Sequence, residues 1–488
     1  MSQSCMSPLN RRNFLQTAAA ASTTFPLFTI AGTKASGRVI GANDTIRIGV
    51  AGINGRGGAH LGAFAGMKKV DVTYLIDPDS RLFGRRTEQV QSQGGNKPQC
   101  VQDVRYALDD PNLDAVSVAT CNHWHSLIGI WACQAGKDAY IEKPISHNIF
   151  EGRKLVEAAQ KYNRVVQHGT QQRSSAKRAQ QINAIQSGKY GKLFVSKGYC
   201  CKPRWSIGFQ SNEAPPSELD YNLWLGPAAD QPFHRNLVHY NWHWFWETGN
   251  GDTGNQGVHE MDVARWAIQH GTLPNRIWSL GGRFAPGEKD LVDQGQTPNM
   301  QLSVFEFGDV LLVFETRGLV GKEGAPARNV GNEFYTSEGK IVDWKFYPKN
   351  GGEPVDVTGD ASITPGGPFG SFIAAVRSRK AEDINCDAEV GHYSSALCHL
   401  GNISYQLGEP TTLDKPCTYL ANNPQVGEAY QALQENLQTI DISLEKAVGN
   451  MGRVLDFDTK TERFVEDDQA NSMLSRTYRK PFVVPEEV

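Results

Sequence analysis

A lysine at the end of a short apolar segment is the residue with the clearest chemical use. Lys143 and Pro144 follow Asp138-Ala-Tyr-Ile-Glu142, which has the composition of a buried strand. In an open parallel sheet, ligands bind at the carboxyl ends of the strands. An ammonium group there can donate to a hydroxyl or carbonyl oxygen and stabilise negative charge that develops on it. Because most lysines lie on solvated surfaces, a purely surface Lys143 is the alternative.

A histidine further along the chain could accept the proton that such chemistry releases. It lies in Asn255-Gln-Gly-Val-His259-Glu-Met-Asp262, and residues 259–269 have the apolar spacing of a helix. Asn255 and His259 are four positions apart, which would place them on one helical face. Imidazole titrates near neutral pH, so His259 is a candidate proton acceptor. A capping or core position for His259 is the alternative.

A glycine-rich turn predicts a nucleotide site. Gly52-Ile53-Asn54-Gly55-Arg56-Gly57 follows an apolar strand and precedes a helix. The dinucleotide fingerprint needs glycines so that the backbone can turn tightly and approach a pyrophosphate, and here Asn54 replaces the middle glycine. Asp77 ends the next strand, where a carboxylate accepts hydrogen bonds from both ribose hydroxyls and repels a 2′-phosphate. The pattern predicts NAD in preference to NADP, with an unliganded tight turn as the alternative.

A polar segment, Thr120-Cys121-Asn122-His123-Trp124-His125, follows a further strand. Asn122 is a suitable N-cap for the next helix, and His125 in its first turn would face the cleft and position a cofactor. The residues predicted to contact the cofactor are Gly52, Asn54, Gly55, Arg56, Gly57, Asp77, Thr120, Asn122, His125, Glu142, Lys143 and Gln172.

The segments that carry these residues alternate between strand and helix. Five strands with intervening helices indicate a doubly wound parallel sheet, that is, an N-terminal Rossmann domain in an α/β protein. From residue 191 onward, longer alternating strands with glycine turns predict a C-terminal α+β domain. Its large, open and mostly antiparallel sheet would face water or a partner on one side. The strands of the first sheet are predicted at 45–52, 70–76, 114–120, 138–142 and 165–168.

The chain of 488 residues is too long for a single core, so several segments are expected. Residues 1–36 are predicted to be an export signal and residues 37–170 the Rossmann domain. Residues 171–430 would form the domain for substrate and oligomerisation. Residues 431–488 would form a C-terminal helix and tail that pack back on the body.

The first residues predict the destination of the protein. Asn10-Arg-Arg-Asn-Phe-Leu15 carries a twin arginine, and the apolar run after it is too short and too polar to span a bilayer. This pattern is typical of a twin-arginine export signal and predicts a periplasmic or otherwise exported protein; a basic disordered tail is the alternative. A net charge of -3 gives no reason to expect nucleic acid as a partner. No later segment is apolar enough for stable membrane insertion.

Taken together, these motifs resemble the Gfo/Idh/MocA oxidoreductase family. The resemblance runs from the Gly52 turn through Glu142-Lys143-Pro144 and the His259 motif to the tail at 461–481. It implies a Rossmann domain followed by an α/β domain, and oxidation or reduction of sugars and cyclitols with NAD(P). It also implies that Lys143 holds the reacting hydroxyl and that His259 takes its proton as the hydride leaves.

Asn255 departs from the family pattern, in which many members have an aspartate four residues before the histidine. A carboxylate would raise the pKa of the imidazole, whereas an amide cannot. We therefore expect the pKa of His259 to lie near its ordinary value of about 6.5, unless Asp252 or Glu260 is close.

The aromatic segment 206–250 is compatible with a sugar site, because tryptophan faces stack on sugar rings. Gln171, Arg235 and Asn236 are further candidates for contacts in the cleft. An exposed sheet face also predicts a homo-oligomer, either a dimer or a tetramer. The residues predicted to bind substrate are Arg173, Lys202, Arg204, Trp205, Trp242 and Trp244.

Three other functions remain open. One is glycoside hydrolysis, in which a bound NAD oxidises the sugar transiently and is then regenerated. Another is sugar binding without catalysis in the periplasm. The third is a metal site at His239 and His243, whose spacing suits zinc on a helix, with His234 as a further ligand. The loop-like context argues against the metal site, and no metal is expected. The sequence has nine cysteines, but none of them forms a Cys-x-x-Cys pair, so a zinc ribbon is not expected.

Overall fold

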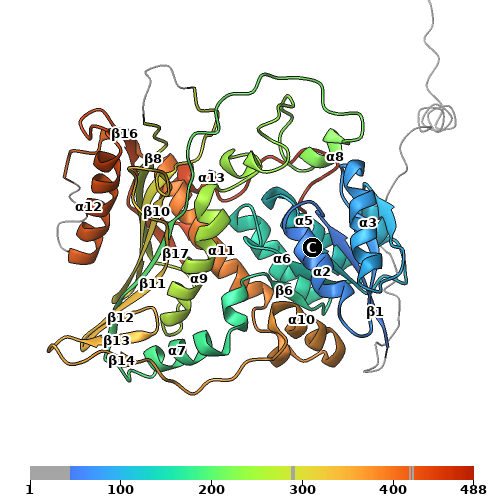
Figure 1. Ribbon diagram of the computed structural model, residues 1–488, viewed down its shortest axis with the longest axis horizontal. Coiled ribbons are helices and arrows are strands. Elements are labelled where there is room, and N and C mark those ends of the chain that lie inside the picture. Colours follow the sequence, from blue (N-terminus) through green and yellow to red (C-terminus); the bar gives the residue numbers. More distant parts are fainter. Residues whose placement is uncertain (1–43, 287–291, 417–418, 420–422) are drawn as a thin grey trace, which may run out of the picture.

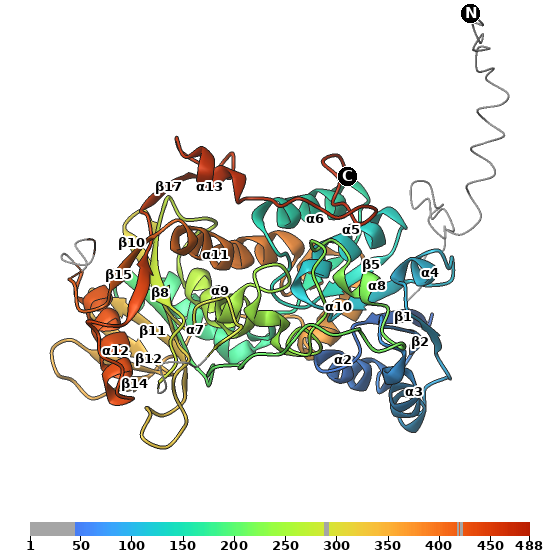
Figure 2. The ribbon, with the colours of Figure 1, turned by 90° about the horizontal axis from the view of Figure 1, so that it is seen from above.

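The computed structural model describes residues 44–286, 292–416, 419 and 423–488 (Figure 1). The predicted export signal, residues 1–36, lies outside these residues. Two sheets dominate the fold and lie at opposite ends of the molecule, with helices on and between them (Figures 1 and 2). The predicted α/β class is confirmed.

Six parallel strands form the N-terminal sheet in the order β3-β2-β1-β4-β5-β6. The strand order reverses between β1 and β4, which is where open parallel sheets bind ligands. Five strands lie where the apolar runs predicted them. β3 was not predicted, because it has three residues and is largely exposed. The strands are β1 (Ile46–Ala51), β2 (Val70–Ile76), β3 (Gln99–Val101), β4 (Ala115–Val118), β5 (Asp138–Ile141) and β6 (Val166–His168).

Helices cover both faces of this sheet. One face carries α5 and α6, and the other carries α2 together with α10, a helix from far along the chain. Phe372 of α10 packs against Phe64 and Tyr140, with ring centroids 6.5 and 5.8 Å apart. The chain therefore returns to the N-terminal sheet after building the second one. The helices are α2 (Arg56–Ala65), α3 (Phe83–Ser92), α4 (Val104–Leu108), α5 (His125–Gln134), α6 (Ile149–Lys161) and α10 (Gly367–Ser378).

The second sheet has twelve strands and is mostly antiparallel, although β7 and β10 run parallel. Its order is β14-β13-β12-β11-β7-β10-β9-β8-β16-β15, and β17 pairs with β8 and β18. The strands are β7 (Leu193–Cys201), β8 (Arg276–Gly282), β9 (Met300–Phe307), β10 (Val310–Arg317), β11 (Asn329–Thr336), β12 (Gly339–Val342), β13 (Lys345–Pro348), β14 (Val355–Asp356), β15 (Glu409–Thr412), β16 (Val448–Met451), β17 (Leu455–Asp458) and β18 (Arg463–Phe464).

Helices pack on both faces of the second sheet as well. Apolar side chains of α9 and α11 share a core with one face, beside α7 (Figure 1). On the other face, Leu433 and Leu437 of α12 pack with Trp278 and Leu302. The expectation of a face open to water or a partner is therefore wrong for the central strands, because α12 of the same chain covers them. The helices are α7 (Ala176–Gln186), α9 (Val258–Ala267), α11 (Ala388–Gln406) and α12 (Pro424–Thr439).

Two irregular segments connect the halves. The segment between β7 and α9 contains α8 (Tyr221–Leu225) and a π-helical turn, Thr253–Gly257. After α13 (Asp468–Ser472), the C-terminal tail crosses to the first sheet, where Phe482 joins the core of α5 and α6 (Figure 2). Among the described residues, no helix is both long and apolar enough to cross a membrane.

Candidate functional site

A cavity of about 400 Å³ opens at the carboxyl edge of the N-terminal sheet. The turns after β1, β2, β4 and β5 form one wall, and the segment between β7 and α9 forms the other. The N-terminal domain and the segment between β7 and α9 therefore enclose the cavity together. Its lining includes Gly52, Asn54, Gly55, Arg56, Asp77, Thr120, Asn122, Trp124, His125, Glu142, Lys143, Leu223, Trp224, His239, Tyr240, Trp242, His243 and Asn255.

The glycine turn after β1 needs glycine at two places. Gly52 has φ +78°, and a Cβ there would lie 2.5 Å from the carbonyl oxygen of Ala119. A Cβ on Gly57 would lie 1.8 Å from the carbonyl oxygen of Gly52. Gly55, which immediately precedes α2, has open space where a Cβ would be. Backbone N–H groups at the start of a helix attract anions, so this open space suits a pyrophosphate.

Asp77 fixes the same turn from the end of β2. Its carboxylate accepts from the backbone N–H of Ile53 at 2.9 Å and from that of Asp79 at 3.0 Å. Burial raises the pKa of Asp77 to about 6, although these hydrogen bonds and the nearby His239 oppose the shift. The carboxylate lines the cavity, and its remaining lone pairs can accept from ribose hydroxyls.

Glu142 provides a buried negative charge beside Lys143. Its Oε1 lies 2.7 Å from Arg56 Nε and 3.1 Å from His60 Nε2. Burial raises the pKa of the carboxyl, but the hydrogen bond and charge of His60, with Arg56 and Lys143, hold it well below its ordinary range. Glu142 is therefore an anion that balances the cations at this edge of the sheet.

Lys143 joins the two parts of the chain. Its Nζ donates to the carbonyl oxygen of Asn255 at 2.6 Å, and both residues line the cavity. Asn255 lies in the π-helical turn that precedes α9, and such turns are frequent at functional sites. Burial lowers the pKa of Lys143, while Glu142 and Asp252 act in the opposite direction.

His259 lies in the first turn of α9, partly buried. It is not among the residues that line the cavity. Burial lowers its pKa to about 3, and the Lys143 ammonium is the largest charge acting in the same direction. The expected pKa of about 6.5 is wrong, because burial disfavours the charged imidazole.

The two acids considered for His259 have other partners. Asp252 pairs with Arg204, with Nε and Oδ1 2.8 Å apart. Glu260 accepts from Gln256 Nε2 at 3.1 Å. The side chain of Asn255 also lies within 3.4 Å of Asp252, so Asn255 meets Lys143 through its main chain.

His125 ties the ends of β4 and β5 together. Its Nδ1 lies 2.6 Å from the carbonyl oxygen of Pro144, and its Nε2 lies 3.1 Å from that of Thr120. Burial lowers the pKa of this imidazole although both carbonyls favour the charged form. A neutral ring has one donor, which we place on Nδ1 because that contact is shorter.

Asn122 does not cap the helix after β4. The helix α5 starts at His125 without a side-chain cap. Asn122 Nδ2 instead donates to Asn250 Oδ1 at 2.9 Å, which joins the cavity wall to the second half of the chain.

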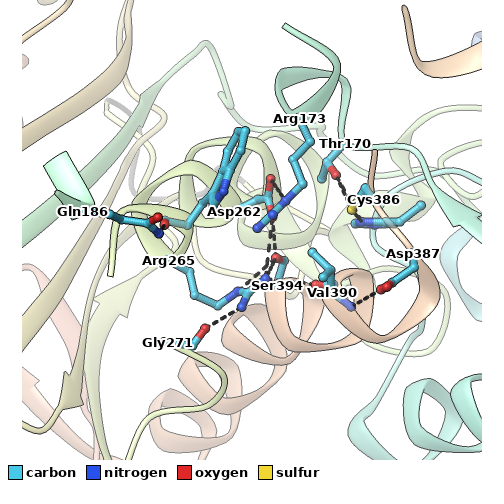
Figure 3. Close-up of polar contacts among 12 residues, drawn as sticks. Thr170, Arg173, Gln186, Asp262, Arg265, Gly271, Cys386, Asp387, Val390 and Ser394 are labelled. Carbon is cyan, nitrogen blue, oxygen red and sulfur yellow. Dashed lines mark hydrogen bonds and ion pairs between the residues drawn. The ribbon is translucent and has the colours of Figure 1, made fainter. Parts of the chain in front are cut away.

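Arg173 is not among the residues that line the cavity, and it pairs with Asp262 of α9 (Figure 3). Its Nε donates to Asp262 Oδ1 at 2.8 Å, and Ser394 Oγ of α11 donates to the same oxygen at 2.5 Å. Arg265 Nε donates in turn to Ser394 Oγ at 3.2 Å. This network connects α9, which carries His259, to the segment after β6 and to α11.

The other predicted substrate residues divide into two groups. Trp242 lines the cavity and stacks on His243, with ring centroids 3.6 Å apart. Arg204 lies over the ring of Trp244 at 5.1 Å. Lys202 donates to Gln256 Oε1 at 2.5 Å, and Trp205 donates to Val320 O at 3.1 Å. Of the residues predicted to contact the cofactor, Gly57 and Gln172 do not line this cavity. Of those predicted to bind substrate, Arg173, Lys202, Arg204, Trp205 and Trp244 do not line it.

Several lining residues were not predicted to contact the cofactor, namely Trp124, Leu223, Trp224, His239, Tyr240 and His243. Their aromatic composition was the available signal, but spacing alone does not reveal which part of a long loop folds over a cleft.

The histidines considered as metal ligands have other partners. His239 Nε2 lies 2.7 Å from Asp79 Oδ2. His243 Nδ1 donates to the carbonyl oxygen of Tyr240 at 2.6 Å. Within the described residues, no group of three or more His, Cys, Asp or Glu side chains could hold a metal ion.

Comparison with known families gives two consecutive matches. Residues 46–170 match the NAD-binding Rossmann fold of the Gfo/Idh/MocA oxidoreductase family, and residues 185–277 match its C-terminal alpha/beta domain.

Curated relatives include enzymes of two kinds. A glycosyl hydrolase family 109 protein of Shewanella pealeana is 24% identical over 217 residues, which cover 41% of this chain and 48% of the relative. A levoglucosan dehydrogenase of Pseudarthrobacter phenanthrenivorans is 24% identical over 315 residues, covering 61% of this chain and 73% of the relative. The chain thus spans about half the length of the glycosyl hydrolase relatives.

Solved structures share the fold. The WlbA dehydrogenase of Bordetella pertussis, in complex with NADH and UDP-GlcNAcA, has a TM-score of 0.53 and 16% identity, covering 72% of this chain and 94% of that one. GenD2 from gentamicin A biosynthesis, in complex with NAD, has a TM-score of 0.51 and 15% identity, covering 74% and 94%.

Proposed function

Because the chain belongs to the Gfo/Idh/MocA oxidoreductase family, we propose that it transfers a hydride between NAD and a CH–OH carbon of a sugar, polyol or sugar derivative. The observation that carries this proposal is the cavity at the sheet edge, where the Gly52 turn, Asp77 and Lys143 share one space. A dehydrogenase among the relatives supports the same reaction class.

The residues of the cavity fit NAD. Gly55 leaves room at the start of α2, where backbone N–H groups can bind the pyrophosphate. Asp77 has acceptor capacity for the ribose hydroxyls, and its charge disfavours a 2′-phosphate. Asn54, Arg56, Thr120 and His125 complete the proposed cofactor contacts. When bound, the oxidised cofactor would accept the hydride and the reduced cofactor would donate it.

Lys143 and His259 divide the remaining chemistry. We assign to Lys143 the orientation of the reacting hydroxyl and the stabilisation of negative charge on its oxygen. His259 is neutral at pH 7 and accepts the hydroxyl proton. Its low pKa makes it a weak base, so the lysine must first lower the pKa of the bound hydroxyl. Asn255 holds Lys143 through its carbonyl, and Trp242 offers a face to the substrate.

Glycoside hydrolysis is a second candidate function, favoured by the glycosyl hydrolase family 109 relatives. In that route, the sugar is oxidised transiently and reduced again after the glycosidic bond has been cleaved. NAD would then be regenerated within the site without net NADH.

We also propose that the protein is exported through the twin-arginine pathway to a periplasmic location, with NAD already held tightly. A homo-oligomer, either a dimer or a tetramer, remains part of this proposal. Because α12 covers the centre of the second sheet, we place the interface of this oligomer elsewhere on the chain. Light scattering of the purified chain measures the number of subunits.

A screen of sugars and glycosides against the purified chain tests the proposed function. NADH absorbance and released sugar are followed together, and nucleotide released by denaturation is identified by mass spectrometry. NADH formation supports the dehydrogenase, whereas free sugar without net NADH supports the hydrolase. A chain that neither carries nor binds NAD would be the non-catalytic alternative and would contradict both.

A further inference from the structure

The cavity has a side that hydride transfer does not use. In the sheet order, β2 and β3 lie on the opposite side of β1 from β5, so the wall after these strands is remote from Lys143. This wall consists of Asp77 and the turn 102–104. Leu223 and Trp224 also line the cavity, although they come from the second half of the chain.

The segment that carries Leu223 and Trp224 is fixed first at the end of β2. The backbone of Leu219 forms an antiparallel bridge with Asp79. Asp220 N donates to the carbonyl oxygen of Pro78 at 2.9 Å, and Gln102 Nε2 donates to the same oxygen at 2.7 Å. The segment therefore lies over the side where Asp77 would hold a ribose.

Trp124 fixes the segment a second time. Its Nε1 lies 3.1 Å from the carbonyl oxygens of both Leu223 and Trp224. Gly226 allows this approach, because a Cβ there would lie 2.2 Å from the Trp124 ring. Trp124 itself lines the cavity, so its ring links the segment to the wall.

The C-terminal tail secures the arrangement from outside. Arg479 donates to the carbonyl oxygen of Asn222 at 2.6 Å and to its side-chain oxygen at 2.5 Å. The backbone N–H of Arg479 also donates to the carbonyl oxygen of Pro227. Phe482 is 1% exposed and meets the Trp124 ring edge-on, with centroids 5.3 Å apart.

We propose that residues 218–228 and the tail 476–488, together called the clasp, bind the adenosine half of the cofactor and set its rate of release. Trp224 and Leu223 offer the apolar surface that a purine ring requires. The tail does not touch the cavity, yet it holds both Trp124 and α8. The clasp rests on the proposed binding of NAD and adds a cofactor-binding element that the glycine fingerprint does not contain.

Release of radiolabelled NAD from the full chain, chased with excess unlabelled NAD, tests the clasp. Phe482→Leu and Arg479→Gln should each accelerate release about tenfold, since weaker contacts appear mainly in the dissociation rate. Val465→Ala is the control, because Val465 is 51% exposed and lies outside the clasp. Radiolabelled ADP-ribose, which lacks the nicotinamide, should show the same acceleration.

The outcomes separate the clasp from the proposed function. Native protein that binds neither NAD nor ADP-ribose contradicts the proposed function itself. Normal release from both tail variants, with NAD still bound, overturns the clasp alone. Acceleration for NAD without acceleration for ADP-ribose places the effect at the nicotinamide end and also overturns it. Arg479→Gln leaves the core intact, so the test stands if Phe482→Leu folds poorly.

Discussion

The surroundings of Lys143 have opposite effects on the pKa of its amine. Burial favours the neutral amine, while Glu142 and Asp252 favour the ammonium. The carbonyl of Asn255 can only accept a hydrogen bond, so it holds the Nζ as a donor. A lysine placed in this way can redirect its N–H hydrogen bond from the carbonyl to a substrate oxygen.

Removing this amine separates catalysis from cofactor binding. We expect Lys143→Ala and the similarly long Lys143→Met to lower the rate of hydride transfer roughly a hundredfold or more, because charge on the substrate oxygen loses its stabilisation. Both variants should retain NAD, which is measured by binding of labelled nucleotide. Turnover close to the native rate in either variant would remove Lys143 from its proposed role.

Asp77 predicts a pH-dependent choice of cofactor. Its pKa is raised to about 6, mainly by burial, so the carboxyl is neutral below this pH and anionic above it. The repulsion of a 2′-phosphate should therefore weaken as the pH falls through 6, and NADP should gain on NAD. Binding of both nucleotides between pH 5 and pH 8, conditions chosen to bracket a pKa of about 6, measures the ratio.

Asp77→Asn is the control for this prediction, because it keeps the acceptor for the Ile53 N–H without the charge. The 2′-phosphate itself also titrates near pH 6, so part of the effect remains in the variant. The amide should show relaxed selectivity at every pH. An identical pH dependence in the native protein and the variant would assign the whole effect to the phosphate.

The sequence predicts that Lys143 and Asp77 lie at strand ends, and both line the cavity; their roles there stay predictions. Partners that depend on tertiary contact could not be predicted. Glu142 meets His60 and Arg56, and nothing in their spacing indicates this cluster. The position of Arg173 after β6 predicts contact with substrate, but Arg173 pairs with Asp262 instead.

The turn between β1 and α2 carries two different glycine requirements. Gly52 needs its positive φ and leaves no room for a Cβ, whereas Gly55 has free space. Substitution of each should therefore have a different consequence.

Gly52→Ala should destabilise the protein by more than about 1 kcal/mol, measured by thermal or urea unfolding without nucleotide. Gly55→Ala should leave this stability nearly unchanged and weaken NAD binding, because the new methyl group occupies the space proposed for the pyrophosphate. Unimpaired NAD affinity in Gly55→Ala would mean that the pyrophosphate lies elsewhere.

Helices and strands with a clear apolar periodicity were predictable. Helices whose apolar and polar residues are mixed on every face were not. α11 is nearly buried along its length and contains Ser, His and Gly throughout, so it has no polar face to mark it as a helix. α12 was anticipated as a helix, but its contact with the second sheet was not, because an amphipathic pattern does not name the surface it covers.

Segments from late in the chain pack against the N-terminal sheet. Phe372 of α10 and Phe482 of the tail are both buried against the N-terminal sheet. Parallel sheets need cover on both faces, and local sequence supplies only part of it here. The two-sheet architecture could be predicted from the order of elements, whereas these returns could not, since they depend on long-range packing.

Export is the prediction that belongs to the whole chain. Replacing Arg11 and Arg12 by lysine should prevent transport through the twin-arginine pathway and leave the protein in the cytoplasm, measured by fractionation of the source organism. The same substitutions should not alter NAD content. Unchanged periplasmic accumulation of the double variant would assign these residues to another role.

The late cover of the N-terminal sheet has a consequence for biosynthesis. A ribosome completes all six strands of that sheet long before it makes Phe372 or Phe482, so the nascent half would expose apolar surface until translation ends. The cavity lining extends to Asn255, so the nucleotide pocket is complete only after part of the second half has been made. For the same reason, a fragment ending near residue 170 should be insoluble or a poor nucleotide binder when it is expressed alone.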